Sequence, residues 1–190
     1  FGNTLNRQYK FKGQTGDNSG TFSLVPSGEL GTGNSLDAIY AVYPYNETAT
    51  ITDDGVITTN VPAVQTYAKN SFGKGANTMV AVTESVEDTF LAFRNTCGYL
   101  KLKLYGEAVI KKIELKGNFG EGISGNAEVV ATYGNTPVLT MKSNAVQTIT
   151  LDCTGGVVLG STAETATEFW FVVPETTFKY GITITATDTN

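Results

Sequence analysis

The sequence predicts an all-β protein, an antiparallel β-sandwich with very little helix. Its composition is that of strands and turns: the 190 residues include 21 glycines, 9 tyrosines and 10 phenylalanines, and threonine is abundant. Aromatic and β-branched side chains suit a pleated, half-buried surface. Apolar and polar residues alternate in many short runs, whereas no long stretch keeps the helical period of 3.6 residues. Because the strands are not interleaved with helices, a parallel βαβ sheet is disfavoured.

Length and charge narrow the class of protein. A hydrophobic fraction of 41% is enough for a packed core, and we expect one domain spanning 1–190. The net charge is −5, and only 16% of the residues are charged. The lysines that lie close together alternate with apolar residues, which predicts a solvated strand face: Lys101, Lys103, Lys111, Lys112 and Lys116. Without a basic stripe, nucleic acid is not expected as a partner.

The N-terminal strand candidates are short and separated by turn-forming residues. They are Tyr9 to Lys12, Gly20 to Val25, and Ala38 to Tyr43. The strongest hairpin signal follows, where 49–52 and 56–59 flank Asp53-Asp54-Gly55. An Asp-Gly pair tolerates the positive φ angles of a tight type I′ turn, so a hairpin is expected there.

The clearest alternation lies in the middle of the chain. Residues 99–105 place three leucines on one face and Lys101 and Lys103 on the other. Gly106 ends this run, and 109–115 repeats the pattern before Gly117. The two runs are adjacent in sequence, so we expect them to pair as a hairpin with a solvated lysine face.

The remaining segments complete a series of strands at the spacing of a sandwich or barrel. They are 79–83, 90–93, 127–131, 138–141, 145–152, 156–159, 167–173 and 181–188. Evidence for helix is limited to one short turn each at 83–88 and 161–168. The glycine runs at 28–33 and 117–122 lack the spacing and the following helix of a phosphate loop, and are interpreted as β-turns.

The residues that usually carry catalysis are sparse. The chain has no histidine, which removes the Ser-His-Asp and Cys-His arrangements and the commonest zinc ligand. Paired carboxylates remain the catalytic alternative. The candidates are Asp53 with Asp54, the group Glu84, Glu87 and Asp88, and the single residues Glu114 and Glu121. Turn or solvated positions explain each of them, so we expect no enzyme, no metal and no cofactor.

Two cysteines, Cys97 and Cys153, leave two alternatives open. In an exported protein they form one disulfide that closes a long loop and contributes up to about 4 kcal/mol. As separate thiols they fit the alternation better, since Cys153 continues an inward face and Cys97 shares the parity of the lysines. A bulge at Gly98 would reset that parity.

Aromatic clusters are the remaining candidates for binding. Tyr40, Tyr43 and Tyr45 surround Pro44, and Trp170 stands between two phenylalanines. Exposed aromatic faces stack on sugar rings, so Tyr40, Tyr45 and Trp170 are candidate ligand-facing residues of a carbohydrate site. Core packing is the favoured alternative for 169–173, because both faces of this strand are apolar.

Several phrases occur along the chain in a fixed order. They include Ala41-Val42-Tyr43-Pro44-Tyr45, Val61-Pro62-Ala63-Val64-Gln65-Thr66-Tyr67, Phe93-Arg94-Asn95-Thr96-Cys97-Gly98-Tyr99-Leu100, Ile113-Glu114-Leu115-Lys116-Gly117-Asn118 and Phe169-Trp170-Phe171-Val172-Val173-Pro174. In this ordered set, from about Ala38 to Asp188, the chain resembles the fimbrillin-like surface proteins of Bacteroidetes.

This resemblance carries several implications. It implies a fimbrillin- or transthyretin-like Greek key sandwich, exported to the outer surface of a Gram-negative anaerobe, with any membrane contact made only through a removed N-terminal lipid anchor. It also implies a role as an adhesion module or pilus subunit that joins other subunits or surface proteins by adding a strand to an exposed sheet edge. We further expect the chain to be the N-terminal part of a longer surface protein. Glycan binding is the alternative function.

Overall fold

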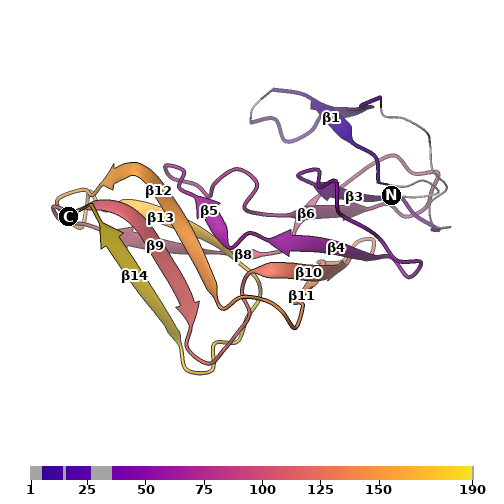
Figure 1. Cartoon of the computed structure of the whole chain (residues 1–190). Helices are drawn as coiled ribbons and strands as arrows, with labels where there is room; N and C mark the ends of the chain where they lie inside the picture. Colours follow the sequence, from indigo (N-terminus) through magenta and orange to yellow (C-terminus); the bar gives the residue numbers. More distant parts are fainter. Residues whose placement is uncertain (1–5, 15, 27–35, 190) are drawn as a thin grey trace.

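The computed structural model describes residues 6–14, 16–26 and 36–189, and this part of the chain is all-β, as predicted (Figure 1). Its strands are β1 (Tyr9–Lys12), β2 (Thr21–Leu24), β3 (Tyr40–Tyr43), β4 (Val56–Val61), β5 (Val64–Thr66), β6 (Met79–Val82), β7 (Arg94–Asn95), β8 (Gly98–Leu104), β9 (Val109–Gly117), β10 (Gly125–Val130), β11 (Val138–Met141), β12 (Thr148–Val158), β13 (Thr167–Val173) and β14 (Ile182–Asp188). No helix forms at 83–88 or 161–168. The glycine run at 28–33 lies outside the described residues.

The strands form sheets that enclose two separate hydrophobic cores. Sheets β3-β6-β7 and β4-β10-β11 enclose the N-terminal core, which we define as Ile57, Val80, Val129 and Ala131. Sheets β14-β9-β12-β5 and β13-β8 enclose the C-terminal core, which we define as Ile110, Ile113, Leu115, Ile123, Ile149, Leu151, Cys153, Phe169 and Phe171. Each core lies between two layers, an arrangement consistent with a β-sandwich.

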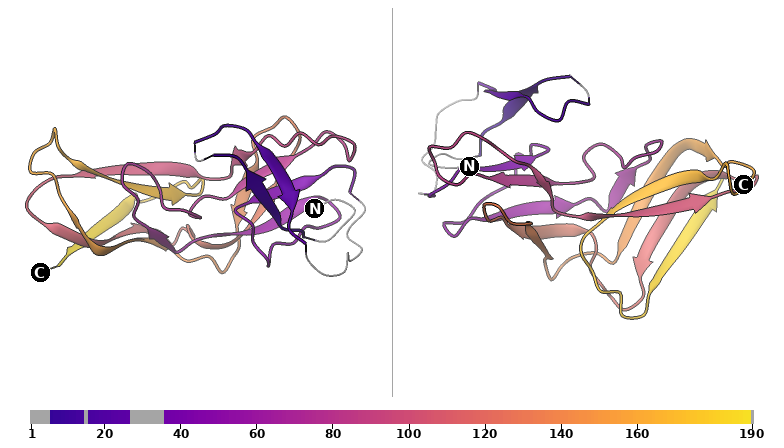
Figure 2. Two further views of the ribbon diagram at one scale, coloured as in Figure 1. Left: turned by 90° about the horizontal axis from the view of Figure 1, so that it is seen from above. Right: turned by 180° about the vertical axis from the view of Figure 1, so that it is seen from behind.

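The two halves lie end to end and share continuous stretches of chain (Figure 2). Only Pro62 and Ala63 separate β4 from β5, and only Thr96 and Cys97 separate β7 from β8. In both cases the chain leaves a sheet of the N-terminal half and enters a sheet of the C-terminal half. The β1–β2 hairpin lies apart from both halves in Figure 1, although Phe22 contacts Phe93 at a ring-centroid distance of 5.9 Å.

The predicted hairpin between 99–105 and 109–115 is wrong. Both segments are strands, and all five lysines named above are exposed, as expected. However, β8 pairs with β13, while β9 pairs with β12 and β14 in the opposite layer. The connection through Gly106 therefore crosses from one layer to the other. Alternation specifies which face of each strand is buried, and it does not specify the neighbouring strand.

The Asp-Gly turn forms, with a geometry that differs from the prediction. The Gly55 amide donates to the Thr52 carbonyl at 3.0 Å, and Thr52 donates to the Val56 carbonyl at 3.0 Å. Gly55 has a φ of +76°, whereas Asp54 has no positive φ, so this is not a type I′ turn. A Cβ on Gly55 would come within 2.6 Å of the Tyr40 hydroxyl oxygen, so glycine is required here for space as well as for conformation.

Three further strand predictions need correction. Segments 145–152 and 156–159 join into one strand, β12, with a register shift between Asp152 and Val157. Residues 90–93 are not a strand, since pairing with β6 begins only at Arg94. The short β5 was not predicted, and it pairs with β12 in parallel, so the sheets are not entirely antiparallel.

Candidate functional site

The three predicted ligand-facing aromatics lie in different environments. Tyr40 is half-buried, packs against the N-terminal core and holds its hydroxyl over Gly55, which is a packing role. Trp170 is half-buried, and its indole N–H donates to a Glu168 carboxylate oxygen at 3.2 Å. The Lys101 ammonium lies 5.1 Å from the centroid of the Trp170 ring and so occupies part of its face. Tyr45 is 40% exposed and lines a groove.

The groove beside Tyr45 has a volume of about 430 Å³ and combines an aromatic ring with polar side chains. Glu47 and Asn60 line it, together with Thr59 and Thr78, whose hydroxyls are 3.2 Å apart. An exposed ring next to carboxylate, amide and hydroxyl groups suits a neutral saccharide, which presents an apolar face and a rim of hydroxyls.

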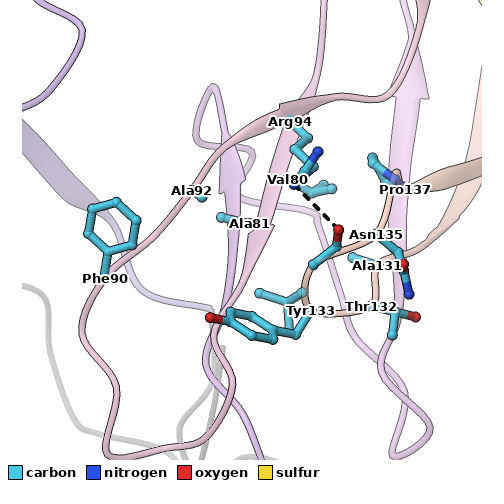
Figure 3. A pocket seen from close by; sticks show the side chains of 12 residues that line it. Val80, Ala81, Phe90, Ala92, Arg94, Ala131, Thr132, Tyr133, Asn135 and Pro137 are labelled. Atoms are coloured by element: carbon cyan, nitrogen blue, oxygen red, sulfur yellow. Dashed lines mark hydrogen bonds between the residues drawn. The ribbon is translucent and has the colours of Figure 1, made fainter.

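A second cavity, of about 160 Å³, lies at the edge of the N-terminal core (Figure 3). Val80, Val82 and Ala131 contribute its apolar wall, and Phe90 and Tyr133 stand at its mouth with 75% and 52% of their surfaces exposed. The cavity exists because 90–93 departs from β6 and leaves this side of the sheet uncovered beyond Arg94.

Arg94 and the turn after β10 supply the polar groups of this cavity. The Arg94 guanidinium donates to the Gly134 carbonyl at 3.5 Å, and no carboxylate of the described residues forms an ion pair with it. The side chains of Thr132, Tyr133 and Asn135 have no hydrogen-bond partner within the described ranges. Sequence reasoning missed this site, because Arg94 and Tyr133 carry no local motif and meet only through the fold.

The cysteines are separate thiols in the structure. Cys97 lies between β7 and β8, half-buried beside the Thr96 hydroxyl, whereas the Cys153 sulfur lies in the C-terminal core near the Leu151 carbonyl. Burial raises the pKa of Cys97, and burial together with the nearby Asp152 charge raises the pKa of Cys153 to about 11. Both thiols are therefore poor nucleophiles at neutral pH.

The candidate carboxylates occupy separate places. Asp53 and Asp54 lie in the turn before β4, and the group at 84–88 lies in the connector after β6. Glu121 accepts hydrogen bonds from the backbone amides of Phe119 at 2.8 Å and Lys179 at 2.9 Å. Desolvation raises the pKa of Glu121, but these backbone hydrogen bonds outweigh it and hold the pKa below its ordinary value. Glu121 thus links the loops that contain Phe119 and Lys179, and this structural role accounts for the residue.

The two layers of the C-terminal half differ in size, since the four-stranded sheet β14-β9-β12-β5 faces the two-stranded sheet β13-β8. The side-chain amide of Gln65 on β5 donates to the Val172 carbonyl at 2.8 Å and accepts from the Val172 amide at 2.9 Å, so β13 lies on the β5 side. The sheet order then places β8 toward β9 and β14.

We call the inward side chains of β8 and β14 the β8–β14 seam: Leu100, Leu102, Leu104, Ile182, Ile184 and Ala186. The leucines and Ile184 are half-buried, and Ile182 remains 36% exposed. Neither β8 nor β14 has a second neighbouring strand in the described part of the chain.

Within the described ranges, no three Cys, Asp or Glu residues gather closely enough to hold a metal ion. The same residues include no helix with the length and hydropathy needed to cross a lipid bilayer. Comparisons with protein-family models, with curated proteins and with solved structures find no match to this chain, so the resemblance to the fimbrillin-like surface proteins stays a prediction.

Proposed function

We propose that this chain is a non-catalytic structural or adhesion module of the cell surface that joins its neighbours by β-strand addition. The observation that carries the proposal is the β8–β14 seam. A strand added beside β8 would pair with its free main-chain groups and cover half-buried leucines at the same time. The surface location rests on the resemblance to fimbrillin-like proteins.

The physical reason is the cost of an open edge. An unpaired strand exposes a row of N–H and C=O groups, and natural proteins usually protect such edges with charges, bulges or covering segments. The seam instead combines an open edge with apolar side chains such as Leu102 and Ile184, which lose little by accepting a partner strand. Main-chain hydrogen bonds would supply affinity, and the apolar side chains would select the register.

The test is sedimentation of the purified protein over a range of concentrations, with hydrogen exchange measured on the same samples. We expect concentration-dependent association, with new protection of amides in β8. The variant Leu102→Lys places a charge in the seam and should abolish association. The matched control Val138→Lys adds the same charge to edge strand β11, at a side chain that is already 60% exposed, and should leave association unchanged. A strictly monomeric protein, or protection confined to β11, would contradict the proposal.

Carbohydrate binding at the Tyr45 groove is the second candidate function. It is favoured because Tyr45, one of the three predicted aromatics, lines a groove whose other walls carry Glu47 and Asn60. We expect Tyr45→Ala to remove binding to neutral glycans on an array, while Trp170→Ala leaves it intact. Loss on Trp170→Ala alone would move the site to the outer face of β13.

A further inference from the structure

The cavity beside Arg94 has features that neither strand addition nor the Tyr45 groove uses. It lies at the other open side of the N-terminal half, between β6, the 90–94 segment and the turn that follows β10 (Figure 3). We propose that this cavity binds an acidic saccharide, with the Arg94 guanidinium holding the carboxylate of a single sugar ring.

The charge of the site is the first step. In a chain with a net charge of −5, Arg94 points toward the cavity without an ion pair to any described carboxylate. The acid nearest in sequence among those with a defined contact, Asp88, directs a carboxylate oxygen at the Phe90 amide, 2.9 Å away. A guanidinium with unused donors forms bidentate hydrogen bonds with a carboxylate, which a neutral ligand does not offer.

The shape of the site is the second step. A volume of about 160 Å³ is below the range of drug-sized ligand sites and admits one small ring, whereas an extended peptide would need more space. Tyr133 and Phe90 leave their rings exposed at the mouth, where they can cover the C–H face of a pyranose. The apolar wall formed by Val80 and Ala131 completes a surface for one face of that ring.

The unpaired polar groups are the third step. Thr132 contributes a hydroxyl, Asn135 an amide and Tyr133 a phenol, and none of them has a hydrogen-bond partner in the described part of the chain. Sugar hydroxyls both donate and accept, so they match such a mixed set. All three side chains are exposed, so water satisfies them in the free protein, and an aliphatic or purely aromatic acid would form no hydrogen bonds with them.

The test uses methyl β-glucuronide and methyl β-glucoside, two probes that differ only in the carboxylate, with binding followed by NMR titration. We expect the glucuronide to bind about tenfold more tightly, because hydrogen bonds to a charged group exceed neutral ones by about that factor. Arg94→Gln should equalise the two probes, and Tyr133→Ala should weaken both. Added salt should weaken the glucuronide only.

Two control variants and one control probe keep the result specific. Lys101→Gln removes an exposed cation elsewhere and Tyr45→Ala alters the other groove; neither should change the preference. N-acetylphenylalanine offers a carboxylate and a ring without sugar hydroxyls. If it binds as well as the glucuronide, if the two glycosides bind equally to the unaltered protein, or if Arg94→Gln keeps the preference, the proposal is wrong. Self-association through the β8–β14 seam is measured separately, so the two proposals fail independently.

Discussion

The two halves of the molecule differ in how completely their layers close. The C-terminal core contains nine buried side chains, including Phe169 and Phe171, and its strands reach 11 residues in β12. The N-terminal core contains four buried side chains, and its strands have six residues or fewer. Both cavities border the N-terminal half. Short strands cover less of the facing layer, so the half with the smaller core is also the half with the candidate ligand sites.

The largest expected effect tests whether the halves unfold together. Phe169→Ala removes a fully buried ring and should cost about 3–5 kcal/mol of unfolding free energy. Because β4–β5 and β7–β8 run through both halves, we expect a single cooperative urea transition whose midpoint is lower than in the unaltered protein. Ile57→Val in the N-terminal core should also lower the midpoint of this single transition, by a smaller amount. Two separate transitions, with only one moved by each variant, would show that the halves are independent.

The next effect concerns the closure of the C-terminal half. Gln65 is 2% exposed and satisfies both main-chain groups of Val172. Gln65→Leu leaves a buried donor and a buried acceptor unpaired, so we expect a loss of about 2–4 kcal/mol in denaturant unfolding. Gln65→Glu is the matched variant of the same shape: when ionised it keeps the acceptor for the Val172 amide but has no donor for the Val172 carbonyl, so it should also lower the unfolding free energy. If Gln65→Leu is neutral, the amide bridge does not hold the layers together.

An intermediate effect appears only at alkaline pH. The folded protein holds the Cys153 proton up to about pH 11, whereas an ordinary thiol loses it near pH 9. Stability contributed by this thiol is therefore complete below about pH 9 and is lost as the pH rises through about 11. In a Cys97→Ala background, urea midpoints should fall over this window, and Cys153→Ala should flatten the fall. A slope that survives Cys153→Ala would assign the loss to another group, such as Tyr67.

The smallest effect lies on the outer face of the C-terminal half. Hydrogen bonding from Lys101, aided by Lys103 and the Trp170 indole, lowers the pKa of Glu168 despite some desolvation. Its stabilisation is present above the ordinary carboxyl pKa of about 4.5 and is lost as the pH falls through the lowered value. Glu168→Gln should make acid unfolding slightly less steep, with almost no change at pH 7. A large change in unfolding free energy at pH 7 would contradict the surface character of the ion pairs that Glu168 forms with Lys101 and Lys103.

Much of the fold was predictable because the alternation of apolar and polar residues within a strand specifies which of its faces is buried. The alternation at 99–105 correctly placed the leucines inward and the lysines in solvent, and the apolar run at 169–173 correctly indicated a buried strand. The candidate sites were harder to predict from the sequence. Tyr45 was named because it is one of several clustered aromatics, whereas Arg94 stood only within a longer phrase, and nothing marked Tyr133 or Asn135.

The sequence by itself determined the all-β class, the solvated and buried faces of most strands, and a repertoire of side chains without histidine. The tertiary structure decided which strands became neighbours: β8 pairs with β13, although 62 residues (105–166) separate them, rather than with the adjacent β9. The physical reason is that side-chain alternation is particular to each segment, whereas main-chain hydrogen-bonding groups are the same in every strand. Pairing, and with it the open edge of β8 and the cavity beside Arg94, therefore follows from how the whole set of strands packs.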